Sequence, residues 1–153
     1  MYLLDSNVYI RGFRELTFGQ ELQDFHQRQL RRVVVSAVVA SELLVGAQTR
    51  RGERAVRRTL IEPFHARRRF LVPVWSTWAL ASAINRRLRA SPATRARLAE
   101  RSFFHDILIA ASAREVGATI VTLNTEDFGL IARCVDIKFV EPWPGLSNSR
   151  GDR

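Results

Sequence analysis

The 153-residue chain is poor in cysteine: it has Cys134 alone, together with one methionine and three histidines. A lone cysteine cannot close a disulfide within the chain, and it cannot supply a cysteine-rich zinc site. The composition therefore excludes a disulfide-stabilised secreted domain and indicates a reducing compartment, which we expect to be the cytoplasm.

Long apolar runs are missing as well. The longest stretch without a charged side chain, residues 70–85, contains Pro73 and falls short of the roughly 20 apolar residues that a membrane helix needs. Residues 1–5 show no basic segment leading into a long apolar run, as a secretory signal would. We expect a soluble protein that does not associate with membranes.

Glycine and proline are scarce, with 8 and 5 residues, whereas 46% of the residues are hydrophobic. This balance excludes a collagen-like fibre and a disordered chain, and the length suits one globular domain. We expect the domain to cover residues 1–142. Residues 143–153, rich in small and polar side chains, are expected to form a flexible tail.

Basic residues exceed acidic ones, 24 against 15, and all the basic residues except Lys138 are arginines. The excess lies in the middle of the chain, which would attract a polyanion such as RNA or DNA. Arg50, Arg54 and Arg58 recur every four residues, so they share one helix face and are the predicted RNA-binding residues. A solvated helix face in an arginine-rich chain is the alternative explanation.

Short apolar runs alternate with helical patterns along the chain. Predicted strands lie at residues 2–4, 33–35, 70–74, 119–122 and 137–140, and the clearest helices lie at 36–47 and 102–115. Pro73 confines the third strand to an edge of the sheet, and Gly117 ends the second helix. Alternation of this kind indicates an α/β fold with a parallel sheet between helices.

Acidic side chains follow these strands or begin the helices after them. The carboxyl ends of parallel strands meet at one edge, where such folds bind ligands. Taken singly, each acid could cap a helix or pair with an arginine; together they need a cation, and oxygen ligands without cysteine or histidine favour Mg²⁺ or Mn²⁺. Such a site supports phosphodiester hydrolysis by activated water. The acids are Asp5, Glu42, Asp106 and Asp127, the last preceded by Asn124.

Four segments, residues 3–7, 41–47, 105–111 and 122–128, resemble in order the motifs of PIN-domain nucleases, and most of all the VapC-type toxins of toxin-antitoxin pairs. The resemblance implies a three-layer sandwich of about five parallel strands flanked by helices. It also implies a Mg²⁺- or Mn²⁺-dependent endoribonuclease that cleaves cellular RNA, is held inactive by a VapB-type antitoxin, and forms a homodimer or a toxin-antitoxin hetero-oligomer.

By position, the resemblance makes Asp5, Glu42 and Asp106 the catalytic acids and metal ligands, with Asp5 and Asp106 as the direct ligands. Ser6 and Asn7 would support them. The fourth position departs from the family pattern, because Asn124 stands where many relatives carry aspartate. We therefore expect Asp127 to act as an outer or substrate-dependent ligand and Asn124 to assist it.

Other functions stay open. A catalytically inactive PIN-like module that binds RNA or assists assembly is the main alternative. A metal-free ribonuclease would use a histidine, but His105 and Asp106 point about 100° apart on a helix, and we expect His105 at the surface or at a partner contact. A receiver-like phosphoacceptor would need a suitably placed lysine, and Lys138 is not one. Several aromatic residues could stack on bases or fill the core: Trp75, Trp78, Phe103, Phe104 and Trp143.

Overall fold

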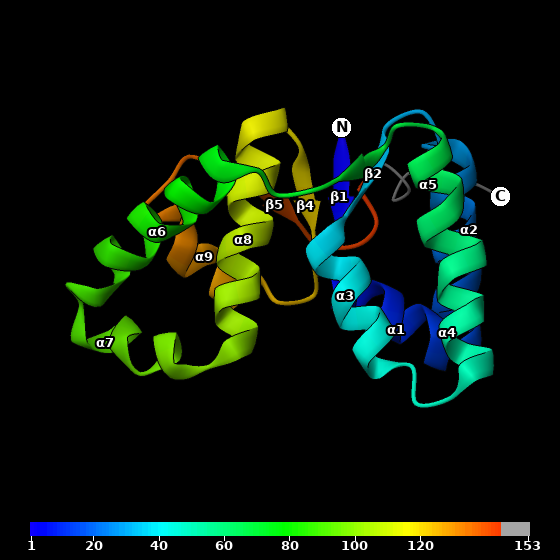
Figure 1. The fold of residues 1–153 in the computed structure, drawn as a ribbon, viewed down its shortest axis with the longest axis horizontal. Coiled ribbons are helices and arrows are strands. Elements are labelled where there is room, and N and C mark those ends of the chain that lie inside the picture. Colours follow the sequence, from blue (N-terminus) through cyan, green and yellow to red (C-terminus); the bar gives the residue numbers. More distant parts are fainter. Residues whose placement is uncertain (145–153) are drawn as a thin grey trace, which may run out of the picture.

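The computed structural model describes residues 1–144 of the chain, without the side chain of Ala93. Five short strands form one parallel sheet in the order β3-β2-β1-β4-β5, with helices on both sides of it (Figure 1). The α/β sandwich is therefore confirmed. The third strand lies at an edge, as predicted, but it ends at Leu71, so Pro73 follows the strand instead of lying within it. The strands are β1 (Tyr2–Leu4), β2 (Val33–Ser36), β3 (Phe70–Leu71), β4 (Thr119–Val121) and β5 (Lys138–Val140).

Nine α-helices connect these strands within residues 1–144, together with a π-helical turn, η1 (Arg57–Ile61), and a 3-10 turn, η2 (Arg97–Ala99). None of these helices is both long enough and apolar enough to cross a bilayer. The helices are α1 (Ser6–Arg14), α2 (Leu16–Arg28), α3 (Ala37–Gly46), α4 (Arg50–Val56), α5 (Glu62–Ala66), α6 (Trp75–Arg89), α7 (Pro92–Arg95), α8 (Arg101–Val116) and α9 (Thr125–Ala132).

Local sequence signals explain two helix ends that position the site. The Ser36 hydroxyl accepts a hydrogen bond from the Val38 amide at 3.1 Å, which caps α3. Gly117, with a φ of 64°, ends α8 in the left-handed conformation that glycine adopts without strain. Gly117 ends its helix as predicted, and Ser36 stands at the predicted start of the helix at residues 36–47.

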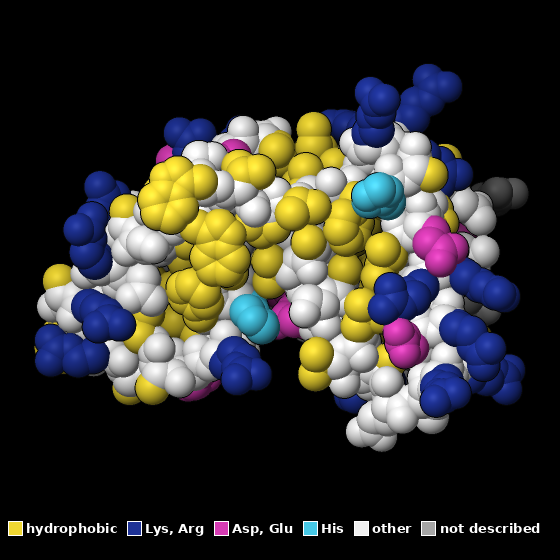
Figure 2. Space-filling model, in the orientation of Figure 1, with side chains coloured by type: hydrophobic (Ala, Val, Ile, Leu, Met, Phe, Trp, Pro, Cys, Tyr) yellow, Lys and Arg dark blue, Asp and Glu magenta, His cyan; other side chains and the backbone are white. Residues whose placement is uncertain are grey.

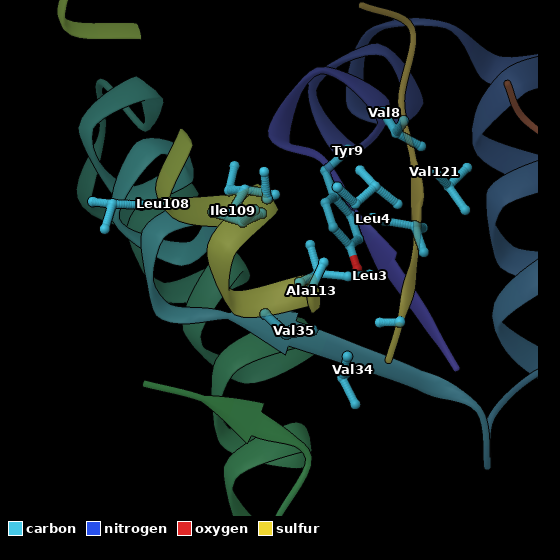
Figure 3. Packing of buried hydrophobic residues seen from close by; sticks show 14 of the residues in the cluster. Leu3, Leu4, Val8, Tyr9, Val34, Val35, Leu108, Ile109, Ala113 and Val121 are labelled. Atoms are coloured by element: carbon cyan, nitrogen blue, oxygen red, sulfur yellow. The ribbon is translucent and has the colours of Figure 1, made fainter. Parts of the chain in front are cut away.

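The core lies around α8 and the central strands. Ile107, Ile109 and Ala110 of α8 are fully buried, because this helix packs against α6, α3 and α9. Figure 3 shows the side chains of Ile109 and Ala113 beside those of β1 and β2. A helix segment that is apolar on nearly all sides must be buried, and this burial fixes Asp106, which directly precedes the segment.

Packing on α2 continues past residue 142. The Trp143 ring lies 4.9 Å from the Phe18 ring and 5.4 Å from the Phe25 ring, and its Nε1 donates to Glu21 at 3.0 Å. The packed chain therefore reaches Trp143, which the sequence analysis assigns to the tail. The rest of that expected tail, residues 145–153, lies outside the described residues.

Two glycines allow α1 and α2 to approach closely. A Cβ added at Gly19 would lie 2.5 Å from the carbonyl oxygen of Gly12, a backbone atom that cannot rotate away. We predict that Gly19→Ala lowers the free energy of unfolding by about 1–3 kcal/mol through overpacking. Gly129→Ala, in α9 with no atom within 4 Å of the added Cβ, is the control and should raise it by up to about 1 kcal/mol. Urea denaturation measures both changes, and equal effects of the two substitutions would contradict the close packing.

Candidate active site

The site lies at β1, where the chain stops adding strands on one side of the sheet and begins to add them on the other. After β1 the chain proceeds to β2 on one side, and β4 pairs with β1 on the other; ligands of open parallel sheets bind at such a switch point, beyond the carboxyl ends of the strands. Asp5 directly follows β1 and Thr122 directly follows β4. The Thr122 hydroxyl donates to Asp5 Oδ2 at 2.8 Å, so the switch point itself carries a buried carboxylate.

Hydrogen bonds fix the Asp5 carboxylate in place. Its Oδ1 accepts from the Ser6 amide at 2.7 Å, and its Oδ2 accepts from Asn7 Nδ2 at 2.7 Å. Asn7 also contacts the end of β4, because its Oδ1 accepts from the Leu123 amide at 3.2 Å. Asp5 therefore caps α1 and is at the same time the most buried acid of the site, with 2% of its surface exposed.

Glu42 and Asp106 approach the same edge from two helices. Glu42 belongs to α3, and its Oε1 lies 2.8 Å from Nδ1 of His105 in α8. Asp106 lies in the second turn of α8 and is 8% exposed. His105 therefore contacts Glu42, an acid of the site in the same chain. The sequence places His105 next to Asp106 and does not indicate this contact with Glu42. A cap role for Asp106 is excluded, since α8 begins at Arg101.

Two acids of the site, Asp106 and Asp5, have raised pKa values. Burial raises the pKa of Asp106 to about 8, and the negative charges of Asp5, Asp127 and Glu42 contribute to the increase. Burial also raises the pKa of Asp5 to about 6, although hydrogen bonds from Thr122 and Ser6 oppose the shift. The structure thus brings together the acids that the sequence places on distant segments.

Asp127 is held by other side chains. Asn124 caps α9 by accepting from the Asp127 amide at 3.3 Å, and its Nδ2 donates to Asp127 Oδ2 at 2.7 Å. Arg97 donates to Asp127 Oδ1 through Nε at 3.1 Å and through Nη2. Arg97 and Thr122 are two site residues to which the sequence analysis gives no role. Thr122 begins the motif at residues 122–128, whereas no motif includes Arg97.

The donor set fits a hard divalent cation in a limited way. Within residues 1–144, no group of three or more His, Cys, Asp or Glu side chains is placed to hold a metal ion together. Mg²⁺ keeps several waters and uses one or two carboxylates, and Asp5 and Asp106 are the two buried acids without a basic side chain bonded to them. Asp127 has Arg97 and Glu42 has His105 as partners. By the chemistry of their donors, Asp5 and Asp106 are the residues that would hold one hydrated cation.

The basic side chains lie on the outer flanks of the molecule. Figure 2 shows Lys and Arg along both sides of a hollow, with a histidine and an acidic side chain at its edge. Arg50, Arg54 and Arg58 are exposed on α4 and η1. Among the aromatic candidates, Phe103 and Trp143 pack inside, whereas Trp75 and Trp78 are 83% and 43% exposed.

We predict that Asp106→Asn stabilises the protein in EDTA at pH 8. The folded-state pKa of Asp106 lies above its ordinary value of 3.8, so its protonated form is favoured in the fold and stability falls as the pH rises toward 8. Removing the charge should raise the free energy of unfolding by about 1–3 kcal/mol and Tm by roughly 3–8 °C.

At pH 5 the folded carboxyl is neutral and only the unfolded chain is ionised, so the difference should be clearly smaller than at pH 8. The control is Asp24→Asn, which removes an exposed acid of α2. Thermal denaturation at the two pH values measures the effect. If Asp106→Asn changed Tm equally at pH 5 and pH 8, the negative charge of Asp106 would not be what destabilises the fold.

Comparisons with solved structures support the fold. FitAB bound to a DNA fragment matches with a TM-score of 0.69 and 20% identity over 94% of this chain and 96% of that one. VapBC-1 from nontypeable Haemophilus influenzae matches with a TM-score of 0.66 and 21% identity over 92% and 96%. DNA-bound VapBC from Salmonella typhimurium matches with a TM-score of 0.64 and 20% identity over 92% and 96%.

A search of curated proteins finds no match. The family model of the PIN domain matches residues 2–133, which include every acid of the site. The chain belongs to the PIN domain family.

Proposed function

We propose that this chain is a Mg²⁺- or Mn²⁺-dependent endoribonuclease that cleaves cellular RNA as the toxin of a toxin-antitoxin pair. The observation that carries the proposal is the pair Asp5 and Asp106, two buried carboxylates with raised pKa at the switch point of a PIN-family sheet. Burying like charges is unfavourable without a cation. We therefore attribute the presence of both acids at the switch point to the function of the site.

A bound divalent cation would supply Lewis-acid activation of water and of the scissile phosphate, and would stabilise the leaving oxygen. Asp5 and Asp106 would hold it. Ser6, Asn7 and Thr122 keep the Asp5 carboxylate in one orientation through their hydrogen bonds, so little reorganisation is needed when the cation arrives.

Glu42 is suited to receive the proton of the attacking water. Its side chain is 19% exposed, whereas the Asp5 and Asp106 residues are 2% and 8% exposed, so it is more open to solvent than they are. His105 Nδ1 fixes Glu42 Oε1. We assign Glu42 the role of general base, since its carboxylate is held in place and is open to solvent.

RNA would reach the acids along the basic flanks. An acidic centre alone repels a polyanion, and exposed arginines beside it compensate by binding phosphates. Arg50 and Arg54 belong to α4 and Arg58 to η1, and α4 lies on one flank of the molecule (Figure 1). We assign these arginines to phosphate contacts outside the scissile position.

A partner antitoxin is supported by the solved structures. The related structures are described as VapBC and FitAB assemblies, some of them bound to DNA. We propose a VapB-type antitoxin that restrains this chain, in a homodimer or hetero-oligomer. The catalytically inactive PIN-like module is the second candidate, favoured by the absence of a preformed three-ligand metal group in residues 1–144.

We predict that Asp5→Asn and Asp106→Asn each reduce Mg²⁺-dependent RNA cleavage by about 10²-fold or more, because each removes a charge that holds the cation. The control Asp24→Asn should cleave at the wild-type rate. Cleavage is measured by mapping new 5′-phosphate ends in cellular RNA, and circular dichroism establishes that the variants fold. Wild-type cleavage rates in either site variant, or no cleavage by the wild type in Mg²⁺ or Mn²⁺, would contradict the proposal.

We also predict that Arg50→Ala, Arg54→Ala and Arg58→Ala weaken RNA binding. Each lost phosphate contact should reduce the slope of log K against log salt by about 0.7–1. Binding is measured by fluorescence anisotropy across a salt series in the Asp5→Asn background, so that RNA stays intact. Arg114→Ala is the control, since Arg114 is exposed at the opposite end of α8 from Asp106. Equal slopes in all variants would assign the three arginines to solvation or to the antitoxin.

A further inference from the structure

We propose that Arg97 is a built-in cation of the site, which neutralises Asp127 and limits the protein to one divalent cation at Asp5 and Asp106. The inference rests on the proposed function, because it concerns the metal that this function needs. It gives Arg97 a positioning role: the guanidinium acts through Asp127 and touches neither the metal nor the water.

The contacts of Asp127 leave no carboxylate oxygen without a donor. Arg97 donates through Nε and Nη2 to Oδ1, and Asn124 Nδ2 donates to Oδ2 at 2.7 Å. Asp5 has donors on both oxygens as well, but these donors are neutral. The donor on Asp127 Oδ1 is a guanidinium, whose positive charge opposes a metal ion at the same carboxylate. The Arg97 side chain is 34% exposed but its partner is only 8% exposed, and a partly buried ion pair is stronger than a surface one.

Arg97 also contacts Glu100, and its positive charge acts on Asp106. Its Nη1 lies 3.5 Å from both carboxylate oxygens of Glu100, the residue that precedes α8. Its positive charge lowers the pKa of Asp106, against the larger effects that raise it. The guanidinium thus extends from the η2 turn to α9 and lies within the field of the acid cluster.

One divalent cation brings the net charge of the cluster close to zero. The acids Asp5, Glu42, Asp106 and Asp127 carry four negative charges when ionised, and Arg97 supplies one positive charge. One divalent cation supplies two more and leaves a single negative charge at Glu42, which has His105 as its neighbour. A second divalent cation would have to lie beside a fixed guanidinium, which like-charge repulsion opposes.

The test is a count of bound Mn²⁺ on the full chain, by titration calorimetry and by electron paramagnetic resonance of free Mn²⁺. We expect about one Mn²⁺ per wild-type chain. Arg97→Gln should free Asp127 and raise the count to about two, the second ion binding more weakly. Arg97→Lys, which keeps the charge, should stay at one. Arg101→Gln, the loss of a nearby exposed arginine, should also stay at one.

A purely structural ion pair would behave differently. Arg97→Gln would then lower stability and leave the count at one, which overturns the inference; a wild-type count of two overturns it as well. Should Arg97→Gln fail to fold, Asp127→Asn in the otherwise unchanged chain decides. That variant should keep one Mn²⁺ with affinity within a few fold of wild type, and a loss of tenfold or more would make Asp127 a ligand.

The same count separates this inference from the proposed function. A wild-type chain that binds no Mn²⁺ and cleaves no RNA contradicts the proposed function, and the inference with it. A wild-type chain that binds one Mn²⁺ and cleaves RNA, beside an Arg97→Gln variant that also binds one, contradicts the inference alone.

Discussion

Two carboxylates buried at the switch point of the sheet are the constraint on which the remainder of the structure depends. Asp5 follows β1, and Asp106 lies on α8 directly before the fully buried Ile107. Burial disfavours the charge of each, and each lies within the field of other acids. The apolar core that α8 forms with the central strands offsets this unfavourable burial of charge.

The acids of the site fall into two classes by their partners. Glu42 and Asp127 contact side chains that carry or can carry positive charge, His105 and Arg97. Asp5 accepts hydrogen bonds from neutral donors only, which orient it without neutralising it. This division separates two chemical roles within the cluster. Under the proposed function, Asp5 would orient the cation, whereas Glu42 would serve proton transfer and Asp127 charge balance.

Much of this architecture is predictable from local sequence. The apolar runs predict the strands, and the third of these is correctly predicted at an edge of the sheet. Ser36 and Gly117 mark two helix ends, and the ordered motifs indicate the family. The acids lie at one edge because parallel strands share their carboxyl ends. These signals are local or periodic, so a single sequence carries them.

The partners of the acids were not predictable in the same way. The contact between Glu42 and His105 joins residues 63 positions apart, and the contact between Thr122 and Asp5 joins residues 117 apart. Arg97 is one arginine among many in a basic region, and only the path of η2 toward α9 selects it. Which donor meets which carboxylate depends on tertiary packing, which spacing along the chain does not encode.

Diffraction from crystals grown with Mn²⁺, measured at a wavelength where manganese scatters anomalously, tests the central claim most directly. The account predicts an anomalous peak within coordination distance of both the Asp5 and the Asp106 carboxylates. Crystals soaked in Mn²⁺ in which no peak touches either carboxylate, with Asp5 bonded only to Ser6, Asn7 and Thr122 as in the metal-free chain, would contradict it.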